Sequence, residues 1–428
     1  MTRPPRPRRR GARRRALVVG TLTASLVALA GCSGAGDGRT TLTFFQFKGE
    51  AVAQFEALAR QFEAENPDVR VVVQNVPDPE TALRTRLVKD DVPDVLTLNG
   101  NGTYGELASA GIFADFAGTE VLDRVNPAYV EVVEALGASE PGAVNGVPFA
   151  ANASGVLYNE ELFAQQGVEV PTTWDELLAA AETFEAAGIT PFYGMLGDAW
   201  TAQSPLAPLT AQDAPEDFFE RRFADETTFA EGWRSASEKL ATLYDYTQAN
   251  AGAVGYQDGT RAFAEGQSAM LLLGSYAVPQ IRSFEPAFTV GSFALPATDD
   301  PERTTLVSGV DVLVTVGADA EHPEEAQRFV DFLVQPDVIA DYAAEQVAIP
   351  TLEGSSNPDP ALAGVQEYID EGRIVGFTDH QFIPAIPLPN LLQEYLLDRD
   401  LDGFLRGLDD SWDQVASRRT WGLGAVQG

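Results

Sequence analysis

The stretch GVPFAANASGVLYNEELFAQQGVEVPTTWDELLAAA, residues 146–181, decides the fold because it places a strand and two helices close together. Residues 156–158 are a short apolar run typical of a buried strand, and residues 160–166 have the composition of a short helix. Thr173 and Glu176 have the spacing of a capping box, which predicts the start of a second helix. The stretch therefore indicates an α/β protein in which strands and helices alternate.

The same alternation runs through the segment that precedes this stretch. Short apolar strands are predicted at residues 42–45, 69–73 and 95–98, with helices at residues 51–66 and 81–88 between them. This order favours a mostly parallel sheet covered by helices. Ligands of such sheets bind beyond the carboxyl ends of the strands, so residues 46–50 and 99–104 are candidates for a site.

The chain after residue 181 continues the α/β pattern and then becomes less regular. Further strands are predicted at residues 268–273, 289–295 and 310–316, and helices at residues 323–334 and 391–405. The roughly 390 residues that follow the N-terminal segment exceed what one hydrophobic core usually holds. Two lobes are therefore expected.

The N-terminus has the composition of an export signal. Eight arginines and no acidic residue lie between Arg3 and Arg15, and an apolar run covers residues 16–30. This run is shorter than the roughly 20 residues that span a bilayer as a helix. Residues 1–31 are therefore predicted to be a signal peptide.

Cys32 is the only cysteine in the chain, and it follows the apolar run directly. The sequence Leu29-Ala30-Gly31-Cys32 resembles the bacterial lipobox, which implies cleavage before Cys32 and a lipid on its thiol. Residues 32–40, rich in Gly and Ser, are then a lipidated tether. We expect a protein on the outer face of the cell membrane, anchored there by the lipid on Cys32.

The charge balance argues against nucleic acid as a partner. The net charge is −34, and eight of the 29 basic residues lie in the signal peptide, so 21 basic residues accompany 63 acidic residues elsewhere. Such a surface repels phosphate backbones.

No enzyme signature is found, and we expect neither catalytic residues nor a cofactor or metal. The chain has no G-x-S-x-G, no Walker loop and no H-E-x-x-H, and its two histidines cannot build a His-rich zinc site. A glycoside hydrolase needs just two carboxylates at the right separation, so that alternative stays open at this point.

Residues 146–181 resemble the central signature of extracellular solute-binding proteins of ATP-driven sugar importers, the maltose-binding class. Three further stretches resemble the same family in the same order: DDVPDVLTLNGNGTYGELASAGIFADF (90–116), FAEGQSAMLLLGSYAV (263–278) and HPEEAQRFVDFLVQPDVIADYAAEQVAIP (322–350). The resemblance implies an α/β fold with two lobes, mixed sheets flanked by helices, and three crossovers between the lobes. It also implies a ligand enclosed between the lobes and a membrane permease that receives it.

Matching by motif places the crossovers near residues 149–152, 291–295 and 346–350. The N-terminal lobe is then expected to comprise residues 40–149 plus 297–345, and the C-terminal lobe residues 152–290 plus 351–428. A monomer is expected.

A pyranose needs planar polar groups for its hydroxyls and aromatic rings for its apolar face. Lys48, Asn99 and Asn101 follow predicted strands, and Asp311 lies in a glycine-containing strand start. The resemblance adds Asn152 at the first crossover, and the aromatic residues Trp200 and Tyr276 on loops that face the cleft in relatives. Asp379 and His380 stand in an irregular segment that could overhang the cleft. The predicted ligand-binding residues are Lys48, Asn99, Asn101, Asn152, Trp200, Tyr276, Asp311, Asp379 and His380.

For the substrate, TFFQFKGEAV (43–52) resembles the branch of the family that binds raffinose and α-1,6-linked oligosaccharides. This resemblance implies an α-1,6-linked oligosaccharide of the raffinose or isomaltooligosaccharide type as ligand. A receptor of the same fold for another neutral sugar, a polyol, a glycerol phosphodiester or a polyamine is the alternative.

Overall fold

The computed structural model describes residues 38–76, 79–89, 91–377 and 386–415. Contacts divide the chain into the unit Met1–Gly38 and the unit Arg39–Gly428, and the second unit is the folded body. The predicted signal peptide and the lipobox cysteine Cys32 lie outside the described residues. No helix of the described part combines the length and hydropathy that a membrane crossing requires.

The first lobe is built on a six-stranded mixed sheet. Its strands, in spatial order, are β11 (Ile349–Pro350), β4 (Val147–Ala151), β10 (Val310–Val316), β3 (Val95–Leu98), β1 (Thr40–Phe45) and β2 (Val69–Gln74). β1 runs parallel to β2 and β3, so the predicted strand–helix order of this segment is confirmed. β10 pairs antiparallel with β3 and β4, and this brings segments far apart in the sequence into one sheet.

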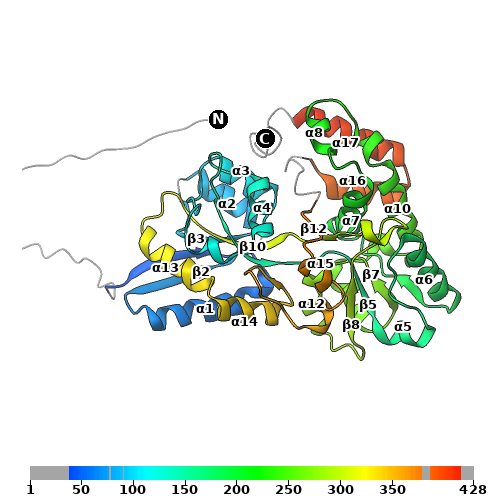
Figure 1. The fold of residues 1–428 in the computed structure, drawn as a ribbon, viewed down its shortest axis with the longest axis horizontal. Coiled ribbons are helices and arrows are strands. Elements are labelled where there is room, and N and C mark those ends of the chain that lie inside the picture. The colour runs from blue at the N-terminus through cyan, green and yellow to red at the C-terminus, as the bar shows by residue number, and fades with distance from the viewer. Residues whose placement is uncertain (1–37, 77–78, 90, 378–385, 416–428) are drawn as a thin grey trace, which may run out of the picture. The chain divides into compact units, whose positions relative to one another are not determined.

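Helices cover both faces of this sheet. They are α1 (Val52–Glu65), α2 (Pro79–Leu87), α3 (Gly102–Ser109), α4 (Pro127–Leu136), α13 (Pro323–Leu333) and α14 (Pro336–Gln346). α1, α13 and α14 pack together on one face, and α3 and α4 lie on the other (Figure 1). α1 forms because Phe55, Leu58 and Phe62 recur at helical spacing and are all buried. Phe44 of β1 contacts Phe55 edge to face at 5.6 Å between ring centroids.

The second lobe contains a four-stranded sheet of different strand order. Its strands are β6 (Thr190–Phe192), β7 (Ser268–Leu271), β5 (Val156–Asn159) and β8 (Val290–Phe293). β5 is antiparallel to β7 and β8, whereas β6 is parallel to β7. A separate two-stranded sheet pairs β9 (Leu306–Val307) with β12 (Ile374–Val375).

Eleven further α-helices accompany these two sheets in the described residues. They are α5 (Glu160–Gln166), α6 (Trp174–Ala186), α7 (Gln203–Asp213), α8 (Phe218–Phe223), α9 (Phe229–Gly232), α10 (Arg234–Asp245), α11 (Tyr256–Ala264), α12 (Val278–Arg282), α15 (Gln366–Asp370), α16 (Leu388–Asp398) and α17 (Leu401–Val415). Short 3-10 turns lie at η1 (Gly49–Ala51), η2 (Leu122–Arg124), η3 (Ala199–Ala202), η4 (Ala251–Ala253), η5 (Ser275–Ala277), η6 (Pro301–Arg303) and η7 (Pro360–Leu362).

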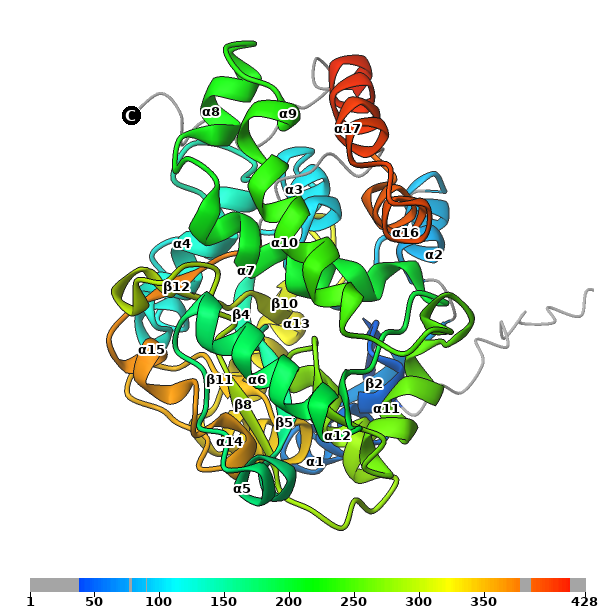
Figure 2. The same ribbon diagram turned by 90° about the vertical axis from the view of Figure 1, so that its right-hand side faces the viewer.

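An aromatic cluster fixes the helical part of the second lobe. Helix α17 packs against α9 and α10, as Figure 2 shows near the top of that view. Trp233 and Trp412 are both buried here, and Phe229 contacts each of them at ring-centroid distances of 5.0 and 5.6 Å. Trp233 is fully buried and therefore belongs to the core.

The two main sheets are joined where β4 leads into β5. The Ser154 N–H donates to the Val307 carbonyl at 2.8 Å, which ties this connection to β9. A Cβ atom on Gly155 would lie 2.3 Å from the Phe293 carbonyl oxygen, so only glycine fits beside β8. The residue boundaries of the lobes, 40–149 plus 297–345 and 152–290 plus 351–428, remain a prediction.

The helix start predicted at Thr173 is confirmed, and one other local prediction differs from the structure. Thr173 accepts from the Glu176 N–H as a capping box requires, and the Glu176 carboxylate accepts from the N–H and the hydroxyl of Thr172. The helix predicted at residues 391–405 is two helices, α16 and α17, separated at Arg399. Arg399 adopts a left-handed conformation with φ of 61°, which ends α16.

Candidate functional site

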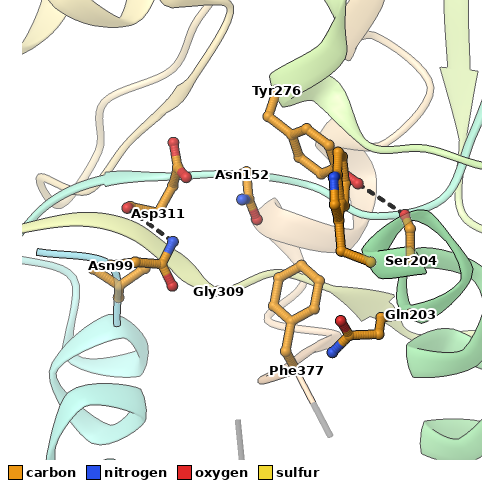
Figure 3. A pocket seen from close by; sticks show the side chains of 10 residues that line it. Asn99, Asn152, Gln203, Ser204, Tyr276, Gly309, Asp311 and Phe377 are labelled. Carbon is orange, nitrogen blue, oxygen red and sulfur yellow. Dashed lines mark hydrogen bonds between the residues drawn. The ribbon is translucent and has the colours of Figure 1, made fainter. Parts of the chain in front are cut away.

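A pocket of about 230 Å³ lies where the ends of β3 and β10 face α7 and the turn after β7. Its lining residues are Asn99, Asn152, Trp200, Gln203, Ser204, Tyr276, Gly309, Val310, Asp311 and Phe377. Figure 3 shows Asn99 and Asp311 on one side, Tyr276, Ser204 and Gln203 on the other, and Asn152 between them. Both lobes therefore contribute to one pocket.

The first-lobe wall is set by the close approach of β10 to the end of β3. The Gly100 N–H donates to the Val310 carbonyl at 2.9 Å. A Cβ atom on Gly100 would stand 2.8 Å from that same carbonyl oxygen, so glycine is required at this turn. The Asn99 side-chain amide then donates to the Asp311 carbonyl at 3.2 Å, which holds Asn99 against the pocket.

A buried ion pair supports this wall from behind. The Lys48 ammonium donates to the Asp311 carboxylate, and the two side chains are only 8% and 11% exposed. Lys48 follows β1, and its carbonyl accepts from the Gln46 side-chain amide at 2.8 Å, which fixes the loop. Asp311 is the only charged residue among the described lining residues, and Lys48 neutralises it. The lining taken together with Lys48 therefore carries no net charge in the described residues.

The second-lobe wall is aromatic. The Tyr276 hydroxyl donates to the Ser204 hydroxyl at 2.9 Å, and this bond orients the tyrosine ring. The Trp200 ring lies 6.3 Å from the Tyr276 ring and 5.2 Å from the Tyr256 ring, measured between centroids. Trp200 is 40% exposed, which is unusual for a large aromatic side chain with two ring neighbours. An exposed indole face beside a polar pocket is available to a ligand.

Asn152 stands at the junction of the two walls. Its backbone N–H donates to the Gly309 carbonyl at 3.2 Å, and its carbonyl accepts from the Ser308 hydroxyl at 2.7 Å. Its side-chain Oδ1 is buried and has no hydrogen-bond partner among the described residues. A buried acceptor without a protein partner costs stability unless a ligand or water donates to it.

The structure brings together five of the predicted ligand-binding residues in this pocket: Asn99, Asn152, Trp200, Tyr276 and Asp311. Lys48 does not line the pocket and reaches it only through Asp311. Asp379 and His380 lie outside the described residues.

Asn101 does not line this pocket. Its side-chain carbonyl accepts from the N–H groups of Thr103 and Tyr104 and thereby caps α3, because asparagine is a favoured N-cap residue. Asn101 instead borders a second, adjoining cavity.

The sequence did not point to Gln203, Ser204 or Phe377 as lining residues. Gln203 and Ser204 begin α7, directly after the short turn that carries Trp200. Their closeness to Trp200 in the sequence could have indicated that they line the same pocket. Among the described residues, no group of three or more His, Cys, Asp or Glu side chains is arranged to hold a metal ion.

A family model described as bacterial extracellular solute-binding protein matches residues 48–340. The chain belongs to this family. The family assignment confirms the two-lobed α/β fold, and it implies a location outside the cytoplasm.

This solute-binding protein has well-defined relatives. It is 29% identical over 332 residues to the multiple sugar-binding protein of Streptococcus mutans serotype c, a match that covers 74% of this chain and 77% of that protein. The solved structure of RafE in complex with raffinose is 29% identical, with a TM-score of 0.79, covering 88% of this chain and 100% of that one. The apo form of RafE from Streptococcus pneumoniae is 28% identical, with a TM-score of 0.77, covering 90% and 100%.

Proposed function

We propose that this solute-binding protein captures an oligosaccharide between its lobes and delivers it to the permease subunits of an ABC importer. The ligand class we propose is an α-1,6-linked oligosaccharide of the raffinose or isomaltooligosaccharide type. The observation that carries the proposal is the pairing of an aromatic wall, Trp200 and Tyr276, with an opposite wall of amide and carboxylate groups. The names of the relatives, multiple sugar-binding protein and RafE with raffinose, support the same class.

The lining chemistry suits a pyranose ring. The C–H face of a sugar packs on an aromatic ring, and its hydroxyls pair with planar amides, which donate and accept, and with carboxylates, which accept. Asn152 Oδ1 provides a buried acceptor that a sugar hydroxyl can satisfy. Asn99 and Asp311 lie on the facing wall, where two neighbouring hydroxyls can be bridged.

The charge of the pocket favours a neutral ligand over the alternatives. A polyamine needs carboxylates without counter-ions, but Asp311 is already paired with Lys48. A glycerol phosphodiester needs a cation in the lining, and Asp311 is the one charged side chain among the described lining residues. A neutral sugar needs neither.

A calorimetric panel on the chain from Ser33 onward tests the proposal. We expect raffinose and panose to bind and maltotriose, spermidine and glycerol 3-phosphate to give no heat of binding. If only another sugar binds, the proposed function as a sugar receptor stands, and the proposed α-1,6-linked ligand class is wrong. Binding only of spermidine or the phosphate ester would contradict the sugar proposal.

The aromatic wall gives a direct prediction. Trp200→Ala and Tyr276→Ala should each weaken raffinose binding by about 1–3 kcal/mol, because truncating an aromatic anchor removes buried ring contact. Tyr276→Phe keeps the ring and loses the hydroxyl that donates to Ser204, so its effect should be smaller. Trp174→Ala is the control, since Trp174 lies at the start of α6 outside the pocket. Unchanged affinity in both alanine variants would exclude this pocket as the sugar site.

We also propose that the protein is tethered by a lipid on Cys32. The sequence around Cys32 supports this, and stable anchoring requires more than one acyl chain. Cys32→Ser should move the protein from the membrane fraction to the medium, and Ser33→Ala should leave it on the membrane. Fractionation followed by immunoblotting measures the distribution. Membrane retention of Cys32→Ser would contradict the proposed anchor.

A further inference from the structure

A second cavity adjoins the proposed sugar pocket in the first lobe. Its volume is about 260 Å³, slightly more than that of the sugar pocket. We call it the side pocket, and it is formed by Phe47, Leu83, Leu98, Tyr104 and Leu107, with Pro79, Asn99, Asn101 and Thr103 at its edge. Asn99 lines both cavities, so the two cavities adjoin at this residue.

The walls of the side pocket are apolar because three elements turn their buried faces towards it. Phe47 follows β1, Leu83 lies on α2, and Leu107 lies on α3. Leu83 and Leu107 are 1% and 6% exposed, so these walls are part of the packed lobe and not a loose surface. The Tyr104 ring is held in place by stacking on Phe113, at 5.8 Å between centroids and 4° between planes.

Two of the polar side chains that line the side pocket are engaged with the protein, whereas the buried Tyr104 hydroxyl has no hydrogen-bond partner among the described residues. The Asn99 amide donates to the Asp311 carbonyl, and the Asn101 side chain caps α3. A second hydroxylated ring in this space would lose its hydrogen bonds to water and find few replacements, which is costly in an apolar site. An apolar group loses no hydrogen bonds and gains the free energy of leaving water.

We propose that the side pocket binds an apolar aglycone, such as a phenyl group, that is attached to the sugar held in the main pocket. An apolar cavity of about 150 Å³ suffices to hold a benzene molecule, so the side pocket has room for one aromatic ring. The proposal rests on the proposed sugar-binding function, and it extends the ligand class from oligosaccharides to aryl glycosides. Because Asn99 lines both cavities, the glycosidic bond of such a ligand would lie beside this residue.

A matched pair of ligands tests the side pocket. Calorimetry on the chain from Ser33 onward compares methyl and phenyl α-D-galactopyranoside, which share the sugar and differ only in the aglycone. We expect the phenyl glycoside to bind roughly 10-fold or more tightly than the methyl glycoside, because a whole aromatic ring leaves water. Equal affinities would overturn the proposal.

A matched pair of variants then locates the effect. Leu107→Phe fills the side pocket and should abolish the advantage of the phenyl glycoside while raffinose still binds. Leu136→Phe is the control, because Leu136 lies on α4, is also 6% exposed, and does not line the cavity. Thermal unfolding confirms that both variants are folded. A phenyl advantage that persists in Leu107→Phe would show that the ring binds elsewhere.

The two proposals can fail separately. Raffinose binding decides the sugar function, and the phenyl-to-methyl ratio decides the side pocket. If no glycoside binds, crystals soaked with bromobenzene still test the cavity through the anomalous signal of bromine. Bromine between α2 and α3 in the wild type, and absent in Leu107→Phe, supports an apolar site, whereas no signal there contradicts it. Phe47→Ala gives a second variant, since Phe47 is only partly buried and its truncation opens one wall.

Discussion

Replacing Lys48 by methionine is expected to lower the free energy of unfolding by about 3–5 kcal/mol, the usual cost of removing one partner of a buried ion pair. The Lys48 and Asp311 side chains are 8% and 11% exposed, so water cannot replace the missing ammonium group. Methionine keeps most of the side-chain volume, so the loss reports the charge and not a cavity. Chemical denaturation of both proteins measures it.

The double variant Lys48→Met/Asp311→Asn should recover most of this loss, because it removes both charges together. Lys89→Met is the control, since Lys89 is exposed and should change stability by less than about 0.5 kcal/mol. In Lys48→Met the pocket gains a net negative charge, so spermidine should begin to raise its melting temperature. Wild-type stability in Lys48→Met would show that the pair is not formed in solution.

Arg222→Met is expected to reduce the free energy of unfolding by a similar amount, about 3–5 kcal/mol. Arg222 lies on α8, is 3% exposed, and pairs with Asp409 at 3.4 Å and with Asp413, both on α17. Its guanidinium also lies over the rings of Phe229 and Trp412, at 5.9 and 5.8 Å from their centroids. Loss of Arg222 therefore leaves the partly buried carboxylate of Asp409 and the faces of two buried rings without their common partner.

The pH dependence of this loss separates charge from packing. Burial raises the pKa of Asp409, and the charge of Arg222 opposes that shift. Without Arg222 the pKa of folded Asp409 rises further, so the folded state binds the proton before the unfolded state does. The deficit of Arg222→Met should therefore shrink as the pH falls through the folded-state pKa of Asp409 towards its unfolded-state value of about 3.9.

Arg234→Met is the matched control for Arg222. Arg234 also pairs with a carboxylate of α17, Asp402, but the two side chains are 42% and 64% exposed. Exposed pairs contribute about 0–1 kcal/mol, so this variant should stay close to the wild type at every pH. An equal loss in the two variants would contradict a special role for the buried arginine.

Local patterns in the sequence were sufficient to predict β1, β2, β3, β5, β7, β8 and β10 and the helices α1, α2, α5, α6 and α13. They did not predict the short strands β4, β6, β9, β11 and β12 or the helices α7 to α12. Residues 95–98 and 310–316 were predicted as strands and are β3 and β10, because continuous apolar runs bounded by turns are typical of buried strands. The break between α16 and α17 was not predicted, because Arg399 rather than glycine adopts the left-handed conformation.

The candidate site was predictable where side chains follow strands, as Asn99 does, and where the family resemblance marked an aromatic residue, as for Tyr276. The pairing of Lys48 with Asp311 was not predictable, because 263 positions separate the two residues and only the fold brings them together. Lys48 was therefore expected to contact ligand directly, whereas the structure places it behind the wall. Asn101 caps α3, because an asparagine before a helix is a favoured cap, and its contact with ligand stays a prediction.

The exposed position of Trp200 has an optical consequence. The chain has five tryptophans, and Trp200 is the one among the described residues that lines the pocket. Trp233 and Trp412 are buried far from water, so their emission stays constant while a ligand changes the polarity around the indole of Trp200. Bound ligand should therefore shift the wavelength of the tryptophan emission, so ligand binding can be followed in the unlabelled protein.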